Sequence, residues 1–167
     1  MPRESRTRRV TLGQVRCYLG KAEEFLAAAH QSLDTGFTLA ATSLAVHAGI
    51  SASDAICGAR TGERAAGSDH SKAVALLEQA GREGKDAARL LTRLTPLKNR
   101  AEYEPQDVSK ATATRAVDQA ERIVQSPARL SRDPFLPMGR VVLCVQKLSI
   151  VRYSPVVPSR SSLVASA

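Results

Sequence analysis

Apolar residues recur every three or four positions through the middle of the chain, which is the spacing that lines one face of an α-helix. The pattern predicts helices over residues 11–33, 37–60, 70–80, 83–95 and 108–125, and a short helical piece over 97–104. Thr11 and Asp107 are suited to cap the first and the last of these helices. Because short connections between amphipathic helices favour antiparallel packing, we expect an all-α fold, an antiparallel bundle of four to five helices.

The helix predicted over residues 37–60 differs from the others, because apolar residues surround most of its circumference. Many of them are alanines, which let neighbouring helices approach closely. This composition predicts the central helix of the bundle. Residues 61–67 are expected to form a loop, and Pro96 and Pro105 both fall where the helical pattern breaks.

The last 41 residues differ in kind from the bundle, because they hold five of the eight prolines. Proline interrupts helices, so residues 127–167 are expected to be an irregular, weakly ordered tail. The β-branched, apolar run over residues 141–151 is typical of a single strand, although a C-terminus altered by a translation artefact would give the same signature. The chain thus divides into a disordered basic arm (residues 1–10), a helical domain (11–126) and this tail.

The net charge is +8 and the isoelectric point is near 9.9. The excess positive charge lies at the two ends of the chain. Residues 1–10 carry +3 and residues 127–167 carry +5, so residues 11–126 are neutral. Excess positive charge favours polyanion binding. Any such binding is therefore expected from the two ends rather than from a face of the bundle, the alternative being that both ends are only solvated.

Several classes of protein are excluded by what the sequence lacks. It has no apolar run of about eighteen residues, as a membrane span needs, and no apolar stretch behind its basic N-terminus, as a secretory signal needs. Its three cysteines (Cys17, Cys57 and Cys144) are far apart and odd in number, which fits neither a disulfide framework nor a zinc site. We expect a cytoplasmic protein with no membrane contact, no metal and no cofactor.

His47 and Asp54 lie two turns apart on the predicted central helix, so they are candidate ligand-binding residues. A hydrogen-bonded pair in the core would use the same two residues. The other histidines are His30, near a helix end where an imidazole can meet free carbonyl groups, and His70, in a helix-start sequence. Cys57 is expected to be buried and unreactive.

The stretch over residues 97–105, Leu-Lys-Asn-Arg-Ala-Glu-Tyr-Glu-Pro, is the most informative part of the chain. A basic residue followed by an Ala-acidic-Tyr-acidic run, just before the last helix, resembles the HEPN superfamily of small helical bundles. The alanine-rich central helix with residues 53–56 and the order of five helices support the resemblance, which covers residues 11–126.

The resemblance implies a range of functions. Many HEPN proteins are metal-independent ribonucleases, often toxins paired with a nucleotidyltransferase-like antitoxin. Others lack the catalytic motif and act as binding or regulatory modules. HEPN domains commonly dimerise with their motifs facing a shared cleft. A homodimer and a nucleotidyltransferase-like partner are therefore what the resemblance implies for this chain.

The family's catalytic motif is an arginine and a histidine separated by four to six residues. Alignment of the Ala-acidic-Tyr run places Lys98 at the arginine, Asn99 at the polar position beside it and Tyr103 at the histidine, and no histidine follows residue 70. An imidazole (pKa ~6.5) exchanges protons at neutral pH, whereas a phenol (pKa ~10) stays protonated. Loss of a matched general acid or base costs about 10²–10⁴ in rate, and lysine replaces a bidentate phosphate fork by a point charge. The motif is degenerate, and no residue is named as catalytic.

The residues left at the degenerate motif are candidate ligand-binding residues: Lys98, Asn99, Arg100 and Tyr103. Two cations, an amide and an aromatic ring can hold a phosphate and stack a base. The structural alternative is that the tyrosine packs against the bundle while the two cations pair with Glu102 or Glu104 at the surface.

Three functions are consistent with these patterns. The first is a non-catalytic HEPN-like binding or regulatory module that contacts RNA, a nucleotide or a partner protein. The second is a metal-independent HEPN-type endoribonuclease with an altered site, in which Lys98 and Arg100 stabilise the phosphorane charge and His47 is the base. The third is a purely structural, dimerising bundle.

Overall fold

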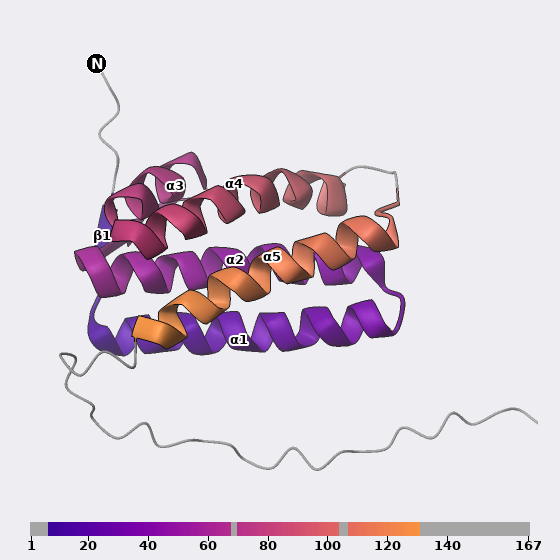
Figure 1. Cartoon of the computed structure of the whole chain (residues 1–167), viewed down its shortest axis with the longest axis horizontal. Helices are drawn as coiled ribbons and strands as arrows, with labels where there is room; N and C mark the ends of the chain where they lie inside the picture. Colours follow the sequence, from indigo (N-terminus) through magenta and orange to yellow (C-terminus); the bar gives the residue numbers. More distant parts are fainter. Residues whose placement is uncertain (1–6, 68–69, 104–106, 131–167) are drawn as a thin grey trace, which may run out of the picture. The chain divides into compact units, whose positions relative to one another are not determined.

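The computed structural model describes residues 7–67, 70–103 and 107–130 of the chain. In chain order the elements are β1 (Thr7–Arg9), α1 (Leu12–Asp34), α2 (Thr38–Thr61), β2 (Glu63–Ala65), α3 (His70–Gln79), α4 (Gly81–Tyr103) and α5 (Lys110–Leu130). Figure 1 shows α1 and α2 as one antiparallel pair and α4 and α5 as another. The predicted all-α, antiparallel bundle is confirmed.

Helix α2 lies at the centre and packs against α1, α4 and α5. Most of its buried residues are alanine, glycine or serine, so the surrounding helices come close to its backbone. At Gly49, an added β-carbon would lie 2.9 Å from Cδ1 of Leu94 in α4 and 3.5 Å from Cδ1 of Ile123 in α5. The prediction of a central helix rich in small residues is confirmed.

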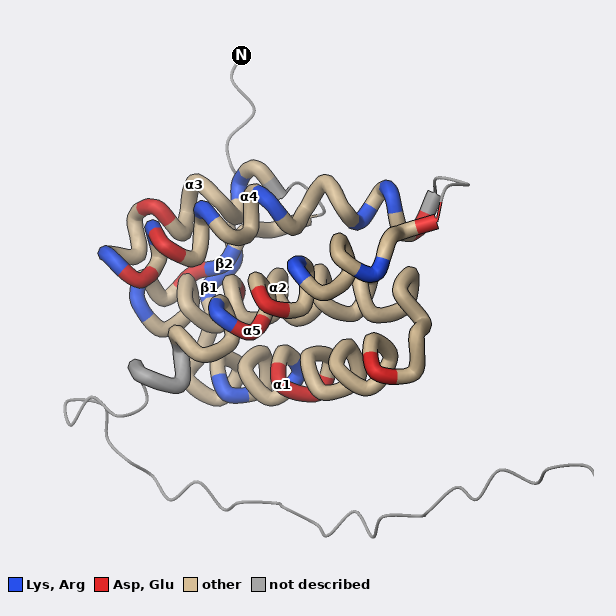
Figure 2. The backbone as a smooth tube through the Cα atoms, turned by 45° about the vertical axis from the view of Figure 1, so that its right-hand side comes forward, with Lys and Arg blue, Asp and Glu red and all other residues tan. Residues whose placement is uncertain are grey.

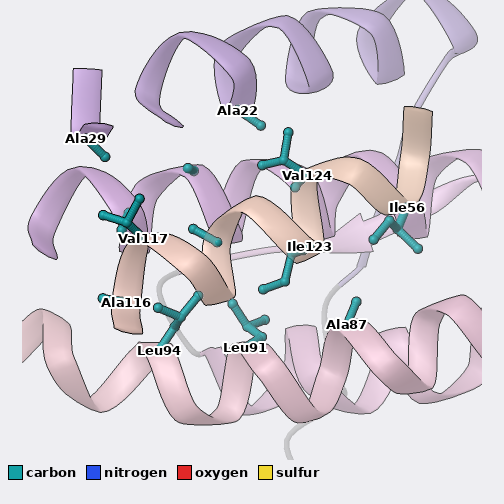
Figure 3. Close-up of a cluster of buried hydrophobic side chains, with 14 of the residues drawn as sticks. Ala22, Ala29, Ile56, Ala87, Leu91, Leu94, Ala116, Val117, Ile123 and Val124 are labelled. Carbon is teal, nitrogen blue, oxygen red and sulfur yellow. The ribbon is translucent and has the colours of Figure 1, made fainter. Parts of the chain in front are cut away.

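The large core side chains come mainly from α4 and α5. Figure 3 shows Leu91 and Leu94 of α4 facing Ile123 of α5, and all three are fully buried. On the other side of α2, the fully buried residues of α1 are Ala22 and Ala29. On the flank of α1, partly buried Phe25, Leu26 and Leu33 also pack against the core, so apolar side chains fill the space on both flanks of α2.

Helix α1 begins where the sequence predicts. The Thr11 hydroxyl accepts a hydrogen bond from the backbone N–H of Gln14, and the Gln14 side chain accepts one from the Thr11 backbone N–H at 2.9 Å. These reciprocal bonds satisfy two of the N–H groups that a helix start leaves unpaired.

Helix α4 continues through Pro96, where the sequence predicted one helix over 83–95 and a separate piece over 97–104. That prediction was wrong. Pro96 is exposed, so the carbonyl that lacks its usual N–H partner can be hydrated. Leu94 and Leu97 pack against the core on either side of the proline, and this burial keeps the helix continuous.

Both ends of α5 also differ from the prediction of 108–125. The start is capped by Ser109 rather than Asp107, since the Ser109 hydroxyl accepts a hydrogen bond from the backbone N–H of Thr112 at 3.3 Å. At the other end, α5 continues past Pro127 to Leu130. A proline in the last turn removes a single backbone hydrogen bond, which a helix end tolerates better than an interior turn.

The two short strands pair with each other across a long separation in sequence. Strand β1 is antiparallel to β2, with Thr7 opposite Ala65 and Arg9 opposite Glu63. Residues 7–9 are therefore not part of a disordered arm, and residues 63–65 are not part of a loop. Neither segment is apolar or alternating enough to predict a strand, and only the tertiary fold brings them together.

The predicted tail lies mostly outside the described residues, which end at residue 130. The strand predicted over residues 141–151 is outside them as well. Within the described part of the chain, no helix is both long enough and apolar enough to cross a membrane.

Gly84 is expected to be intolerant of a side chain, although it lies in a helix. An alanine β-carbon at this position would lie 2.2 Å from the backbone oxygen of Leu77 and 2.7 Å from the β-carbon of Ala80. Overpacking of this kind costs about 1–3 kcal/mol, so Gly84→Ala should lower the free energy of unfolding, measured by urea denaturation.

The matched control is Gly20→Ala in α1, where an added β-carbon meets nothing within 4 Å. Alanine is favoured over glycine in a helix interior by about 1 kcal/mol, so this variant should be more stable than the parent chain. If both substitutions stabilise the protein, the close contact between α3 and α4 is absent.

Candidate functional site

The residues that the sequence predicts to form the degenerate motif lie at the C-terminal end of α4. Asn99 and Arg100 are exposed, and within the described residues their side chains make no hydrogen bond or ion pair. Lys98 is only 26% exposed. Tyr103 is the last residue of α4, and its side chain lies outside the described part of the chain. The predicted candidates therefore divide between two faces of the helix.

The carboxylate of Glu102 connects α4 to α2. It accepts a hydrogen bond from the Ser43 hydroxyl at 3.3 Å, and its Oε1 lies 3.5 Å from Nε2 of His47. Its second oxygen lies 4.0 Å from Nζ of Lys98, one turn earlier on the same helix. These four residues, here called the Glu102 cluster, bring His47 and Lys98 to one carboxylate.

The imidazole of His47 also contacts α1. Its ring centroid lies 5.4 Å from that of Phe25, with the planes inclined by 33°. The ammonium of Lys21 lies 5.7 Å from the same Phe25 ring, a cation–π distance. Three helices therefore fix the imidazole, whose side chain remains 39% exposed.

Asp54 pairs with a residue of the small sheet and not with His47. Its Oδ2 lies 3.8 Å from Nη1 of Arg64 in β2, and the Asp54 side chain is only 16% exposed. Burial raises the pKa of Asp54 from 3.8 to about 6, against the opposing effect of the Arg64 and Lys21 charges. Seven residues along a helix span about 10 Å, which is why the suggested pairing of His47 with Asp54 does not form.

The thiol of Cys57 is buried, as predicted, with 2% exposure. Burial, together with the nearby Asp54 carboxylate, raises its pKa to about 12. At neutral pH the group is therefore a protonated thiol, which is a poor nucleophile and a poor metal ligand.

The Glu102 cluster combines a carboxylate, an ammonium, an imidazole and a hydroxyl. The carboxylate balances the charge of Lys98 and restricts His47 to one position, which is how an acidic partner usually fixes an imidazole. Among the described residues, no group of three or more histidine, cysteine or acidic side chains is arranged to hold a metal ion.

Sequence reasoning missed Ser43, Phe25 and Lys21 as neighbours of the site. Glu102 was recognised only as a surface partner for the two cations. The spacing of Lys98 and Glu102 on one helix was a usable signal. Nothing local to Ser43 or Phe25 signals proximity to α4, since that contact depends on how the helices pack.

The raised pKa of Asp54 predicts a pH dependence of stability. The native carboxyl holds its proton up to about pH 6, whereas an unfolded one loses it near 3.8. The native state therefore binds more protons between these values, and the contribution of Asp54 to stability is lost as pH rises through this window. One pKa unit corresponds to about 1.4 kcal/mol, so the loss should be on the order of 3 kcal/mol.

Asp54→Asn should remove this pH-dependent loss of stability. Urea denaturation at pH values from 4 to 7 would measure the free energy of unfolding of the variant and of the parent chain. The stability of the variant should rise relative to the parent chain over that range. Asp118→Asn, at an exposed position of α5, is the control and should preserve the parent's profile. Equal profiles for Asp54→Asn and the parent would contradict burial of this carboxyl.

Comparison with known proteins shows the family of the chain. The family model described as the HEPN domain matches residues 15–130, a range that begins in α1 and runs to the end of α5. No curated protein matches the chain. The matched range is more than half of the sequence, and on that basis the chain belongs to the HEPN domain family.

Proposed function

We propose that this chain is a non-catalytic HEPN module, one that acts by binding a partner and not by cleaving RNA. The sequence places a phenol, Tyr103, where the family's catalytic motif has its histidine, and no histidine occurs after residue 70. A phenol stays protonated at neutral pH. The position therefore lacks the group that would exchange a proton with the substrate.

The observation that carries the proposal is the position of Glu102. Its oxygens lie 4.0 Å from the Lys98 ammonium and 3.5 Å from the His47 imidazole. A phosphate entering this place would meet a carboxylate of the same sign of charge, and Lys98 would have to leave its partner to hold the phosphate. Both effects oppose the binding of a scissile phosphate.

Surface chemistry at this end of the bundle favours a protein partner over RNA or a nucleotide. Phe37 is 67% exposed and Leu39 is 39% exposed, and Leu39 lies one turn before Ser43 on α2. The exposed Arg100 and Asn99 add polar groups on α4. Apolar anchors with an arginine nearby are typical of protein interfaces. A second copy of the chain and a nucleotidyltransferase-like protein are the partners that the family suggests.

The proposal predicts that the purified full chain does not cleave RNA. A fluorescent single-stranded RNA, incubated with the protein and a metal chelator, should remain intact. The double substitution Lys98→Ala and His47→Ala should leave the result unchanged. Metal-independent cleavage that the double substitution abolishes would overturn the proposal.

A ribonuclease with an altered site is the second candidate, and one observation favours it. His47 and Lys98 contact the same carboxylate, so the two groups that such a site needs are close together. In this scheme His47 accepts the proton of the ribose 2′-hydroxyl as its oxygen attacks phosphorus. The bond between phosphorus and the 5′-oxygen breaks, and the 5′-oxygen takes up a proton from water, while Lys98 and Arg100 stabilise the negative charge on the phosphorane oxygens.

The second candidate predicts that any cleavage depends on His47 specifically. His47→Ala should lower the cleavage rate at least a hundredfold, the usual minimum for a general base. His30→Ala is a matched control, because His30 also lies near a glutamate, 3.8 Å from Glu121, and is similarly exposed. Equal rates for both variants and the parent would trace the cleavage to another site or to a contaminating nuclease.

A further inference from the structure

A second polar surface lies between α4 and α5, away from the Glu102 cluster. It is a hollow of about 480 Å³, and three of the residues that line it are arginines: Arg89 and Arg93 of α4 and Arg122 of α5. Figure 2 shows basic residues on both of these helices. The volume falls in the range of small-molecule sites.

Positive charge in the hollow exceeds negative charge. Its lining contains one acidic residue, Asp86, whose Oδ1 lies 3.4 Å from Nη1 of Arg89. Within the described residues, Arg93 and Arg122 have no acidic partner. Three guanidinium groups that share a hollow with one carboxylate leave an excess of positive charge, and a bound anion would compensate that excess.

The packing of α4 against α5 brings these guanidinium groups together from two helices. Arg89 and Arg93 are one turn apart on α4, a spacing of about 6 Å along the axis, and Arg122 faces them from α5. Each guanidinium presents a fork of donors that matches two oxygens of a phosphoryl group. Arginines at this spacing can therefore hold neighbouring phosphoryl groups of one ligand.

The rest of the lining indicates that the phosphoryl groups are the part recognised. Leu90 is the one apolar side chain among the lining residues, and none of them is aromatic. Peptide and drug-like ligands need more apolar contact than this, and single-stranded nucleic acids need aromatic rings on which bases stack. The remaining polar groups belong to Gln125, which also donates to Glu121 at 3.1 Å, and Ser126.

We propose that the hollow between α4 and α5 binds a small ligand with two or more linked phosphoryl groups, held by Arg89, Arg93 and Arg122. The site is distinct from the Glu102 cluster, because none of the residues that line the hollow belongs to that cluster. The linked phosphoryl groups can belong to an inorganic oligophosphate or to a nucleotide.

The test is a calorimetric titration of the full chain with tripolyphosphate at low salt. Arg93→Gln and Arg122→Gln should each weaken binding at least tenfold, and the double variant should bind more weakly still. Neither arginine has an acidic partner in the described residues, so circular dichroism melts of the variants should match the parent. Arg16→Gln, at an exposed position of α1, makes the same charge change outside the hollow and should bind like the parent.

Comparison of ligands identifies the source of the phosphoryl groups. Equal affinity for tripolyphosphate and ATP would support recognition of the phosphates alone, whereas tighter binding of ATP, still dependent on Arg93, would support a nucleotide. Orthophosphate should bind much more weakly than either, because it supplies a single phosphoryl group.

Three outcomes would overturn the proposal. The first is tripolyphosphate affinity that survives the double substitution, which would assign binding to the basic ends of the chain. The second is an equal loss of affinity in Arg16→Gln, which would indicate a response to net charge alone. The third is Arg93-dependent binding of single-stranded RNA without binding of tripolyphosphate. RNA cleavage assays report on the Glu102 cluster, so the two proposals can fail separately.

Discussion

The burial of α2 on most of its sides is the constraint on which the rest of the structure depends. Small residues along this helix let α4 and α5 approach its backbone, and Gly49 leaves no room for a β-carbon beside Leu94. The approach of α4 has a consequence at its C-terminal end, where Glu102 comes within reach of Ser43 and His47. The candidate site thus follows from the same packing that forms the core.

The helical part of the fold was largely predictable because apolar periodicity is local. The errors fall where distant residues decide the outcome. Helix α4 continues through Pro96 because leucines on both sides, one buried and one half-buried, pack against the core. Strand β1 forms because residues far along the chain supply its partner. Helix and strand propensities describe each segment of the chain alone. They therefore predict helix breaks that tertiary packing prevents, and they miss strand pairs that form only when distant segments are brought together.

The sequence identified only some members of the candidate site, and it did not predict the geometry that joins them. Lys98 and His47 were identified separately from sequence, one by a motif position and the other as a histidine in an apolar helix. Both contact Glu102. The contact with Lys98 follows from the spacing of the two residues on one helix, whereas the contact with His47 depends on how α4 packs against α2. The arginines at positions 89 and 93 also share a helix face, yet only the fold places Arg122 opposite them. Helix spacing therefore predicts the pairs that share α4, and only the packing of the helices adds the residues from α2 and α5.

The net charge of the bundle hides a difference between two faces of α4. The formal charges of residues 11–126 sum to zero. The sequence therefore led to the expectation that polyanions bind at the ends of the chain and not on the bundle. That total, however, combines two different local balances of positive and negative charge on α4. Toward α2, the charge of Lys98 is compensated by Glu102; toward α5, three arginines share one aspartate. Because electrostatic attraction in water weakens within about 10 Å, a ligand responds to the nearby charges and not to the total. A neutral domain can therefore oppose phosphate binding at the C-terminal end of α4 and, as proposed above, favour it beside the middle of the same helix.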